Sequence, residues 1–179
     1  MEKLNKLEHT LLDIGLKMKT GLTVDFRNHD ILRDESEEGA IPLFYSQHIQ
    51  DGIVKFPINK EHEYVVTVQR GLRQQDKNYL FVKRFTAKEE KRRLQCGVYL
   101  SKKSPQYDVI STQNKINFID GLATEMSECV VYGLYVLFNS TLYDSYYRIL
   151  NDSTQVNSTE VNAIPVPELK IIQEIGRKL

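Results

Sequence analysis

Basic side chains are concentrated in one short part of this 179-residue chain. The formal net charge of the whole chain is zero, yet residues 70–103 carry 11 Lys and Arg against 3 Asp and Glu. Six of these cations fall within positions 83–93. Clustered Lys and Arg neutralise phosphates and release their counterions, so the cluster indicates a surface for a polyanion. The alternative is an ordinary solvated face of a folded protein.

The basic cluster begins on an expected strand, 78–85. Strict alternation places its side chains on two faces. One face carries Tyr79, Phe81, Lys83 and Phe85, and the other carries Leu80, Val82 and Arg84. The aromatic side chains are expected to fill the core rather than stack on bases. After this strand, Thr86 and Glu89 have the spacing of a capping box, which predicts a short helical turn. That turn would display Lys88, Lys91, Arg92 and Arg93.

Patterns for catalysis are scarce. The sequence has no Gly-rich phosphate loop, no Cys/His metal spacing and no Gly-x-Ser-x-Gly motif. Its four histidines are scattered and are expected on the surface or in loops, and the two cysteines are expected to be free thiols. One weak pattern remains: Asp108, Gln113 and Lys115 imitate a Mg²⁺-dependent nuclease site. No cofactor or metal is otherwise expected on this chain.

The element pattern predicts a single α+β domain over residues 1–179. Leucines at helical spacing predict an N-terminal helix or docking segment in 1–20. Residues 21–123 read as a mostly antiparallel sheet region, and 124–179 as a C-terminal helical region. No apolar run reaches the ~18 residues of a membrane helix, so no membrane partner is expected. Expected strands cover 41–49, 53–58, 63–69, 78–85 and 94–100, with further candidates at 106–111 and 115–121.

A polar stretch, 151–170, raises a separate question. Asn157 and Glu160 have the spacing of a capping pair for a short turn over 158–163. Ser153, Thr154 and Gln155 have no local role that the sequence explains.

Several segments together resemble a known family. They are residues 19–57, 79–93, 114–121 and 133–167. In this order they are similar to the C-terminal target-recognition region of adenine-specific DNA modification methylases of restriction–modification systems. Residues 138–142 and 153–167 also resemble the end of recognition domains in type I specificity subunits. The resemblance extends from about Gly15 over nearly the whole chain.

The resemblance implies a module that reads double-stranded DNA. In such enzymes a separate N-terminal domain binds S-adenosylmethionine and methylates an adenine flipped out of the duplex. This chain would therefore carry no catalytic residue and no cofactor, its partner would be a methyltransferase domain or subunit, and it would act in a bacterial or archaeal cytoplasm. The DNA contacts that follow from the resemblance are Lys83, Arg84, Lys88, Lys91, Arg92, Arg93, Arg27, Gln113, Asn114 and Lys115. Base reading is expected from less typical positions, namely Arg70, Arg73, Gln74, Gln75 and Asn78.

Two other functions stay open at this point. One is the nuclease that uses Asp108, Gln113 and Lys115. The other is a protein-docking module whose basic face meets an acidic partner.

Overall fold

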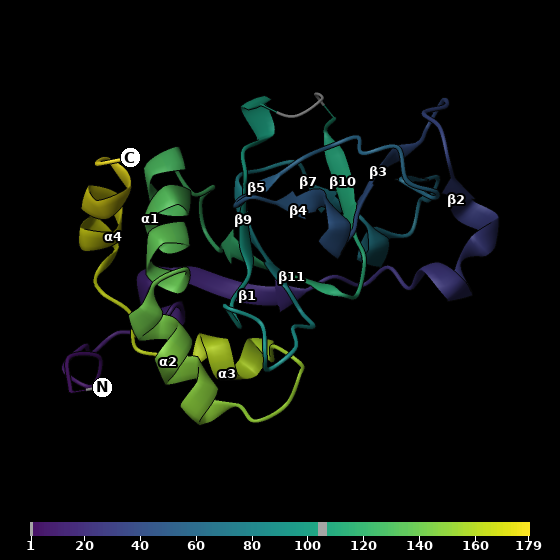
Figure 1. Cartoon of the computed structure of the whole chain (residues 1–179). Coiled ribbons are helices and arrows are strands. Elements are labelled where there is room, and N and C mark those ends of the chain that lie inside the picture. Colours follow the sequence, from purple (N-terminus) through teal and green to yellow (C-terminus); the bar gives the residue numbers. More distant parts are fainter. Residues whose placement is uncertain (1, 104–106) are drawn as a thin grey trace.

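The computed structural model describes residues 2–103 and 107–179 and has an α+β architecture with two mixed sheets (Figure 1). The first sheet has the strand order β1-β11-β8-β9-β5-β4. All its neighbours are antiparallel except β5 and β9, which are parallel. Its strands are β1 (Leu16–Thr20), β4 (Ile49–Gln50), β5 (Ile53–Val54), β8 (Tyr79–Lys83), β9 (Cys96–Tyr99) and β11 (Ile116–Gly121).

The second sheet has the order β2-β6-β3-β10-β7. Only β3 and β10 are parallel in it. Its strands are β2 (Leu32–Arg33), β3 (Ile41–Phe44), β6 (Tyr64–Val65), β7 (Gln74–Gln75) and β10 (Val109–Thr112). Most of the expected strands are therefore present in shortened form, and the expectation of mostly antiparallel pairing is confirmed.

The α-helices follow the sheets in the chain, as expected. They are α1 (Glu128–Phe138), α2 (Thr141–Leu150), α3 (Ser158–Asn162) and α4 (Leu169–Gly176). Short 3-10 helices are η1 (Leu12–Ile14), η2 (Asp25–Arg27), η3 (His29–Ile31), η4 (Ser46–His48), η5 (Arg70–Leu72) and η6 (Ser101–Lys103). Helices α1 and α4 lie side by side in Figure 1, because Gly133 and Gly176 let the two backbones approach closely. None of the described helices has both the length and the apolar character needed to span a bilayer.

The two faces of β8 pack into different clusters, which confirms the predicted alternation. Leu80 and Val82 join a large core formed with the helices. Tyr79 and Phe81 join an aromatic cluster between strands, where the ring centroids of Phe81 and Tyr99 lie 5.2 Å apart. Strand β8 thus lies between the two cores. The basic residues 84–93 follow directly after its last residue, Lys83.

Of the helix or docking segment expected in residues 1–20, the helix is wrong. Residues 2–6 form turns, η1 follows, and Leu16 already begins β1. Strand β1 pairs with β11 along its whole length, from Leu16 opposite Gly121 to Thr20 opposite Asn117. Leucines at positions 4, 11 and 16 do reach the large core, but from turns and a strand. Long-range pairing with β11 therefore prevails over the local helical pattern.

One histidine also departs from expectation. His48 is fully buried in η4, although it was expected at the surface. Its Nδ1 accepts a hydrogen bond from the Tyr45 backbone N–H at 2.8 Å. The proton on Nε2 is then donated to Glu63 Oε1 at 2.9 Å. Burial lowers the pKa of His48, and the contact with Glu63 offsets this only in part.

Candidate nucleic-acid interface

Residues 84–93, here called the basic loop, connect β8 to β9 and are held by a buried arginine. Arg93 is 1% exposed. Its backbone N–H donates to Asp144 Oδ1 at 2.6 Å, and its Nε donates to Thr86 Oγ1 at 3.1 Å. Its Nη2 donates to the Ser153 carbonyl at 2.6 Å, and the guanidinium lies 5.7 Å from the Tyr147 ring centroid. Arg93 thus ties the basic loop to α2 and to the polar stretch.

A second arginine holds the same loop from outside. Arg148 of α2 donates from Nε to Asp144 Oδ2 at 2.8 Å. Its two terminal nitrogens donate to the carbonyl oxygens of Lys88 and Glu90, each at 2.7 Å. Asp144 is 5% exposed and therefore connects the two arginines in a largely buried network. The loop backbone is fixed by these charged hydrogen bonds and is not an open, mobile tether.

This arrangement corrects two expectations about the loop. Residues 86–93 form a turn and bends, and none of them is helical. The Ala87 N–H is accepted by Glu90 instead of by a Thr86–Glu89 capping box. Contacts with Ala87 and Gln95 lower the pKa of Glu90, so the carboxylate stays charged. Arg93, predicted to contact DNA, is buried and serves the fold, because its Nε and Nη2 donate within the protein and its side chain does not reach the surface.

The polar stretch lies beside the basic loop, and its backbone pairs with the first residues of that loop. The Val156 N–H donates to the Arg84 carbonyl at 2.6 Å, and the Thr86 N–H donates to the Thr154 carbonyl at 3.0 Å. Between these bonds, Phe85 and Gln155 form an antiparallel bridge. The residues that the sequence left unexplained therefore pair with the first part of the basic loop.

The cap predicted for the short turn is confirmed in part. Asn157 is the N-cap of α3, and its side chain accepts the Thr159 N–H at 2.8 Å. Glu160 does not complete a capping box, because its carboxylate accepts from the Tyr147 hydroxyl at 3.2 Å and from Asn151. The Asn157 N–H donates to the Tyr147 hydroxyl instead, at 3.0 Å.

The turn at 113–115 joins the basic loop to the segment around Arg27. Arg84 Nη1 donates to the Asn114 carbonyl at 2.8 Å, and its backbone N–H donates to the Lys115 carbonyl at 3.1 Å. On the other side, the Asn114 N–H donates to the Thr23 carbonyl at 2.9 Å. The structure therefore brings three separately predicted segments together.

Gln113 contributes to this junction from inside the fold. It is 3% exposed, and its Nε2 donates to Asp25 Oδ1 at 3.3 Å. Gln113 was predicted to contact DNA, but its side chain positions η2 and its neighbour Arg27. Lys115, in contrast, is exposed. Only the backbone of Asn114 is used in the contacts described above.

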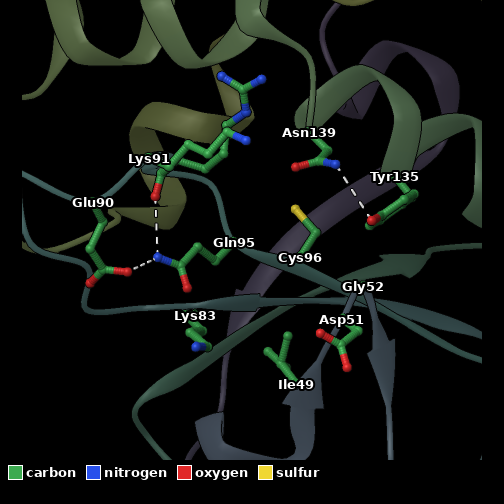
Figure 2. Close-up of a pocket in the computed structure, with 11 residues that line it drawn as sticks. Ile49, Asp51, Gly52, Lys83, Glu90, Lys91, Gln95, Cys96, Tyr135 and Asn139 are labelled. Atoms are coloured by element: carbon green, nitrogen blue, oxygen red, sulfur yellow. Dashed lines mark hydrogen bonds between the residues drawn. The ribbon is translucent and has the colours of Figure 1, made fainter.

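A pocket of about 360 Å³ opens beside the basic loop (Figure 2). Three cations line it, from the end of β8 and from the loop, together with two side-chain amides. These residues are Lys83, Lys91, Arg92, Gln95 and Asn139, and the carboxylates of Asp51 and Glu90 line the pocket as well. Gln95 Nε2 donates to the Arg92 carbonyl at 3.2 Å and also contacts Glu90, while Asn139 Nδ2 donates to the Tyr135 hydroxyl at 3.4 Å.

The charges around this pocket differ in their availability. Arg92 donates to Thr141 Oγ1 at 3.1 Å and lies 4.0 Å from Asp144. Lys88, outside the pocket, pairs with the exposed Asp152 at 2.8 Å. Lys83 and Lys91 make no ion pair within residues 2–103 and 107–179. These two lysines are therefore the cations best placed to neutralise an external phosphate.

One wall of the pocket depends on a glycine. Gly52 has a φ of 80°, and a Cβ there would collide with the Tyr135 hydroxyl. Only glycine adopts this backbone conformation at little cost, so Gly52 lets the turn between β4 and β5 approach α1. The wall opposite the basic loop is therefore set by the backbone.

The residues expected to read bases lie elsewhere. Arg70 and Arg73 are exposed and line a second pocket of about 420 Å³ with Lys19, Leu22 and Gln74. Gln75 is exposed on strand β7.

Asn78 is mostly buried, at 8% exposure, and its amide bonds to the Met126 carbonyl and the Ser101 N–H. Asn78 is thus a structural residue, and the expectation that it reads bases is not supported by its position.

The nuclease triplet does not form a site. Asp108 precedes β10 and Gln113 follows it, so the four residues of this strand, or five residue rises, separate their backbones by about 17 Å. Gln113 is also buried against Asp25. Within the described parts of the chain, no group of three or more His, Cys, Asp and Glu side chains could hold a metal ion. Cys96 and Cys129 are both free, as expected.

Sequence reasoning missed the residues that fix the basic loop. Asp144 and Arg148 stand four apart on α2, a spacing that signals an ion pair on one helix face. Nothing in the sequence shows that this pair receives a loop from 51 residues away.

Comparison with known proteins places this geometry in a wider context. Over 181 aligned residues, which cover 99% of this chain, it is 34% identical to the type II methyltransferase M.BsuBI of Bacillus subtilis. It is 32% identical, over the same coverage, to the type II methyltransferase M.PstI of Providencia stuartii. Nearly the whole chain is therefore similar to one part of a type II methyltransferase. The chain spans 36% of the length of each of these relatives.

No protein-family model matches the chain. The similarity to M.BsuBI and M.PstI therefore rests on pairwise alignment of this chain with about a third of each relative, and it agrees with the methylase resemblance drawn from the sequence segments. It covers the basic loop, the 113–115 turn and the polar stretch alike, because 99% of the chain is aligned.

Proposed function

We propose that this chain is the target-recognition domain of an adenine-specific DNA methyltransferase in a restriction–modification system. It binds double-stranded DNA and presents a target adenine to a separate domain that binds S-adenosylmethionine. The observation that carries this proposal is the match of nearly the whole chain to only about a third of two methyltransferases. A recognition module is one part of such an enzyme, and the catalytic domain is another.

The cation arrangement supports a role in DNA binding. Lys83, Lys91 and Lys115 project from the end of β8, the basic loop and a turn, whose backbones are fixed by hydrogen bonds. Fixed cations meet a phosphate backbone with little ordering cost, and each phosphate contact adds salt-dependent affinity. In this proposal these lysines, with Arg27 and Arg84, contact the backbone, and Arg70 and Arg73 are candidates for base reading.

The proposal assigns different roles to this chain and to the methyltransferase domain. S-adenosylmethionine and the reacting adenine belong to the partner methyltransferase domain or subunit. The chain here supplies orientation, because a base can be methylated only when its nucleotide is held at the partner's site. Its place of action is the bacterial or archaeal cytoplasm, where the DNA lies.

Binding of labelled duplex DNA tests the proposal directly. We expect affinity to fall steeply as salt rises from about 50 to about 200 mM, since each phosphate contact contributes to the salt slope. Selection from a random duplex library is expected to enrich one sequence motif that contains adenine. Binding without any enriched motif would reduce the chain to a non-specific basic surface, and binding indifferent to salt would contradict the proposed interface.

A further inference from the structure

Two exposed phenylalanines stand beside the basic surface and are not explained by phosphate binding. Phe26 is 64% exposed and Phe85 is 47% exposed. Other aromatic side chains of this region, such as Phe81 and Phe118, are buried in the aromatic cluster. Phe85 was expected to join them in the core. An apolar ring kept in water lowers no folding free energy by burial, but single exposed apolar side chains are common, so the surroundings of each ring decide its role.

The backbone holds both rings in place. Phe85 bridges Gln155 between two flanking hydrogen bonds, so its strand cannot turn the ring inward without breaking that pairing. Phe26 lies in the 3-10 helix η2, where Asn28 Nδ2 donates to the Val24 carbonyl at 2.6 Å. Neither ring lies on an unanchored loop tip.

Each ring carries an arginine. The Arg27 guanidinium lies 5.4 Å from the Phe26 ring centroid, and that of Arg84 lies 5.4 Å from the Phe85 ring centroid. Both arginines are adjacent in sequence to their rings. A cation over an aromatic face beside a basic surface combines a stacking platform with a phosphate contact.

The two platforms flank one turn. Thr23, three residues before Phe26, bonds to one side of the 113–115 turn, and Arg84 bonds to the other. Two neighbouring strand spacings separate those backbones, which is about 10 Å. The pairing therefore brings the segments that carry Phe26 and Phe85 to the same turn.

We propose that Phe26 and Phe85 stack on nucleobases that are unpaired in the bound DNA, while Arg27 and Arg84 contact neighbouring phosphates. This inference rests on the proposed function. In an intact duplex the base faces are covered by their neighbours, and only edges are open in the grooves. Extrusion of a target nucleotide exposes base faces at the site, and an aromatic ring covers such a face. The two rings would thus favour the opened duplex.

The test compares a fully paired duplex with the same duplex carrying a short unpaired stretch labelled with 2-aminopurine. We expect the chain to bind the opened duplex about ten-fold more tightly and to quench the fluorophore, because stacking of a base on an aromatic ring contributes at this scale. Phe85→Leu should reduce both the preference and the quenching, and the double variant Phe26→Leu, Phe85→Leu should bring the preference close to one. Phe85→Tyr keeps an aromatic face and should behave like the wild type.

The control is Ile149→Ala, because Ile149 of α2 is also 64% exposed but belongs to neither arginine–phenylalanine pair. It should change neither affinity, and thermal melting should show that every variant is folded. A Phe85→Leu variant that keeps the full preference overturns the stacking role and points to a protein contact for this ring. Equal binding of both duplexes by the wild type overturns it as well but leaves the proposed function standing. Absence of binding to any DNA overturns both.

Discussion

Two cations of the basic loop, Arg93 and Lys91, carry the same charge and have opposite physical roles. At one end, Arg93 is buried and donates to Asp144, Thr86 and Ser153. In the middle, Lys91 is exposed and makes no ion pair within the described parts of the chain. A buried guanidinium must satisfy its donors inside the protein, whereas an exposed ammonium keeps its charge for an external partner. A count of cations in the sequence therefore overstates the number available for binding. The contacts of each side chain in the fold show which cations are available.

Loss of the anchor should give the largest effect. Arg93→Ala keeps the backbone bond to Asp144 but removes the guanidinium that donates to Thr86 and Ser153 and leaves a cavity, so we expect a loss of roughly 2–5 kcal/mol of stability. Chemical denaturation measures it. Lys91→Ala is the matched control in the same loop and should change stability by less than about 0.5 kcal/mol. Equal stability of the two variants would contradict the assignment of Arg93 as an anchor and Lys91 as a free cation.

Charge reversal at the exposed Lys91 should weaken DNA binding and leave the stability of the protein unchanged. Lys91→Glu is expected to weaken duplex affinity about ten-fold and to lower the salt slope by about one unit, because one phosphate is no longer neutralised. Fluorescence anisotropy over a salt series measures both quantities. Lys17→Glu makes the same charge change on the exposed face of β1 and serves as the control. If both variants bind equally, the cations act only through net charge and the loop makes no specific contribution.

Acidic pH should lower the stability of the protein through His48, beside the second sheet, and not through the basic loop. Burial lowers the pKa of His48 from the ordinary value of 6.5, so the folded state binds a proton less readily than the unfolded chain. Stability from this group is present above about pH 6.5 and is lost as the pH falls toward its folded pKa. Unfolding free energies at about pH 7.5 and pH 5.5 should show this loss in the wild type.

Two substitutions assign that acid sensitivity. His48→Gln should reduce the pH dependence in this window, while His29→Gln, at an exposed histidine, should keep it. An unchanged slope in His48→Gln would show that another group causes the sensitivity.

The smallest effect is expected at the exposed ion pair of the loop. Lys88 and Asp152 lie 2.8 Å apart, but Asp152 is fully solvent-exposed, so water and salt screen the pair. Lys88→Ala should leave the melting temperature unchanged while weakening duplex binding if Lys88 exchanges Asp152 for a phosphate. A clear drop in melting temperature would instead place Lys88 with the anchoring residues.

Much of the strand pattern could be predicted because alternation is a local signal. The two faces of β8, the positions of β9 and β11, and the helices after residue 124 all follow from apolar spacing. The N-terminal helix could not be predicted correctly, since the pairing of β1 with β11 depends on residues about a hundred positions away. His48 was misplaced for the same reason, because its partner Glu63 lies on a different segment.

The candidate surface was predicted in part. Composition located the basic loop, but it could not distinguish the buried Arg93 from the exposed Lys91, because burial depends on what packs against each side chain. Gln113 and Asn78 have polar side chains that suit DNA, yet both satisfy partners inside the fold. Polar residue type alone does not show whether the partner is the protein or a ligand.

The sequence by itself determined the α+β class, the short strands, the cap at Asn157 and the concentration of positive charge, since each depends on neighbouring residues. Only the tertiary structure decided which cations are free, which are anchors, and that the polar stretch pairs with the basic loop. These outcomes depend on contacts such as Arg93 with Asp144, 51 positions apart. Desolvation couples such distant groups, and it acts only after the chain has folded.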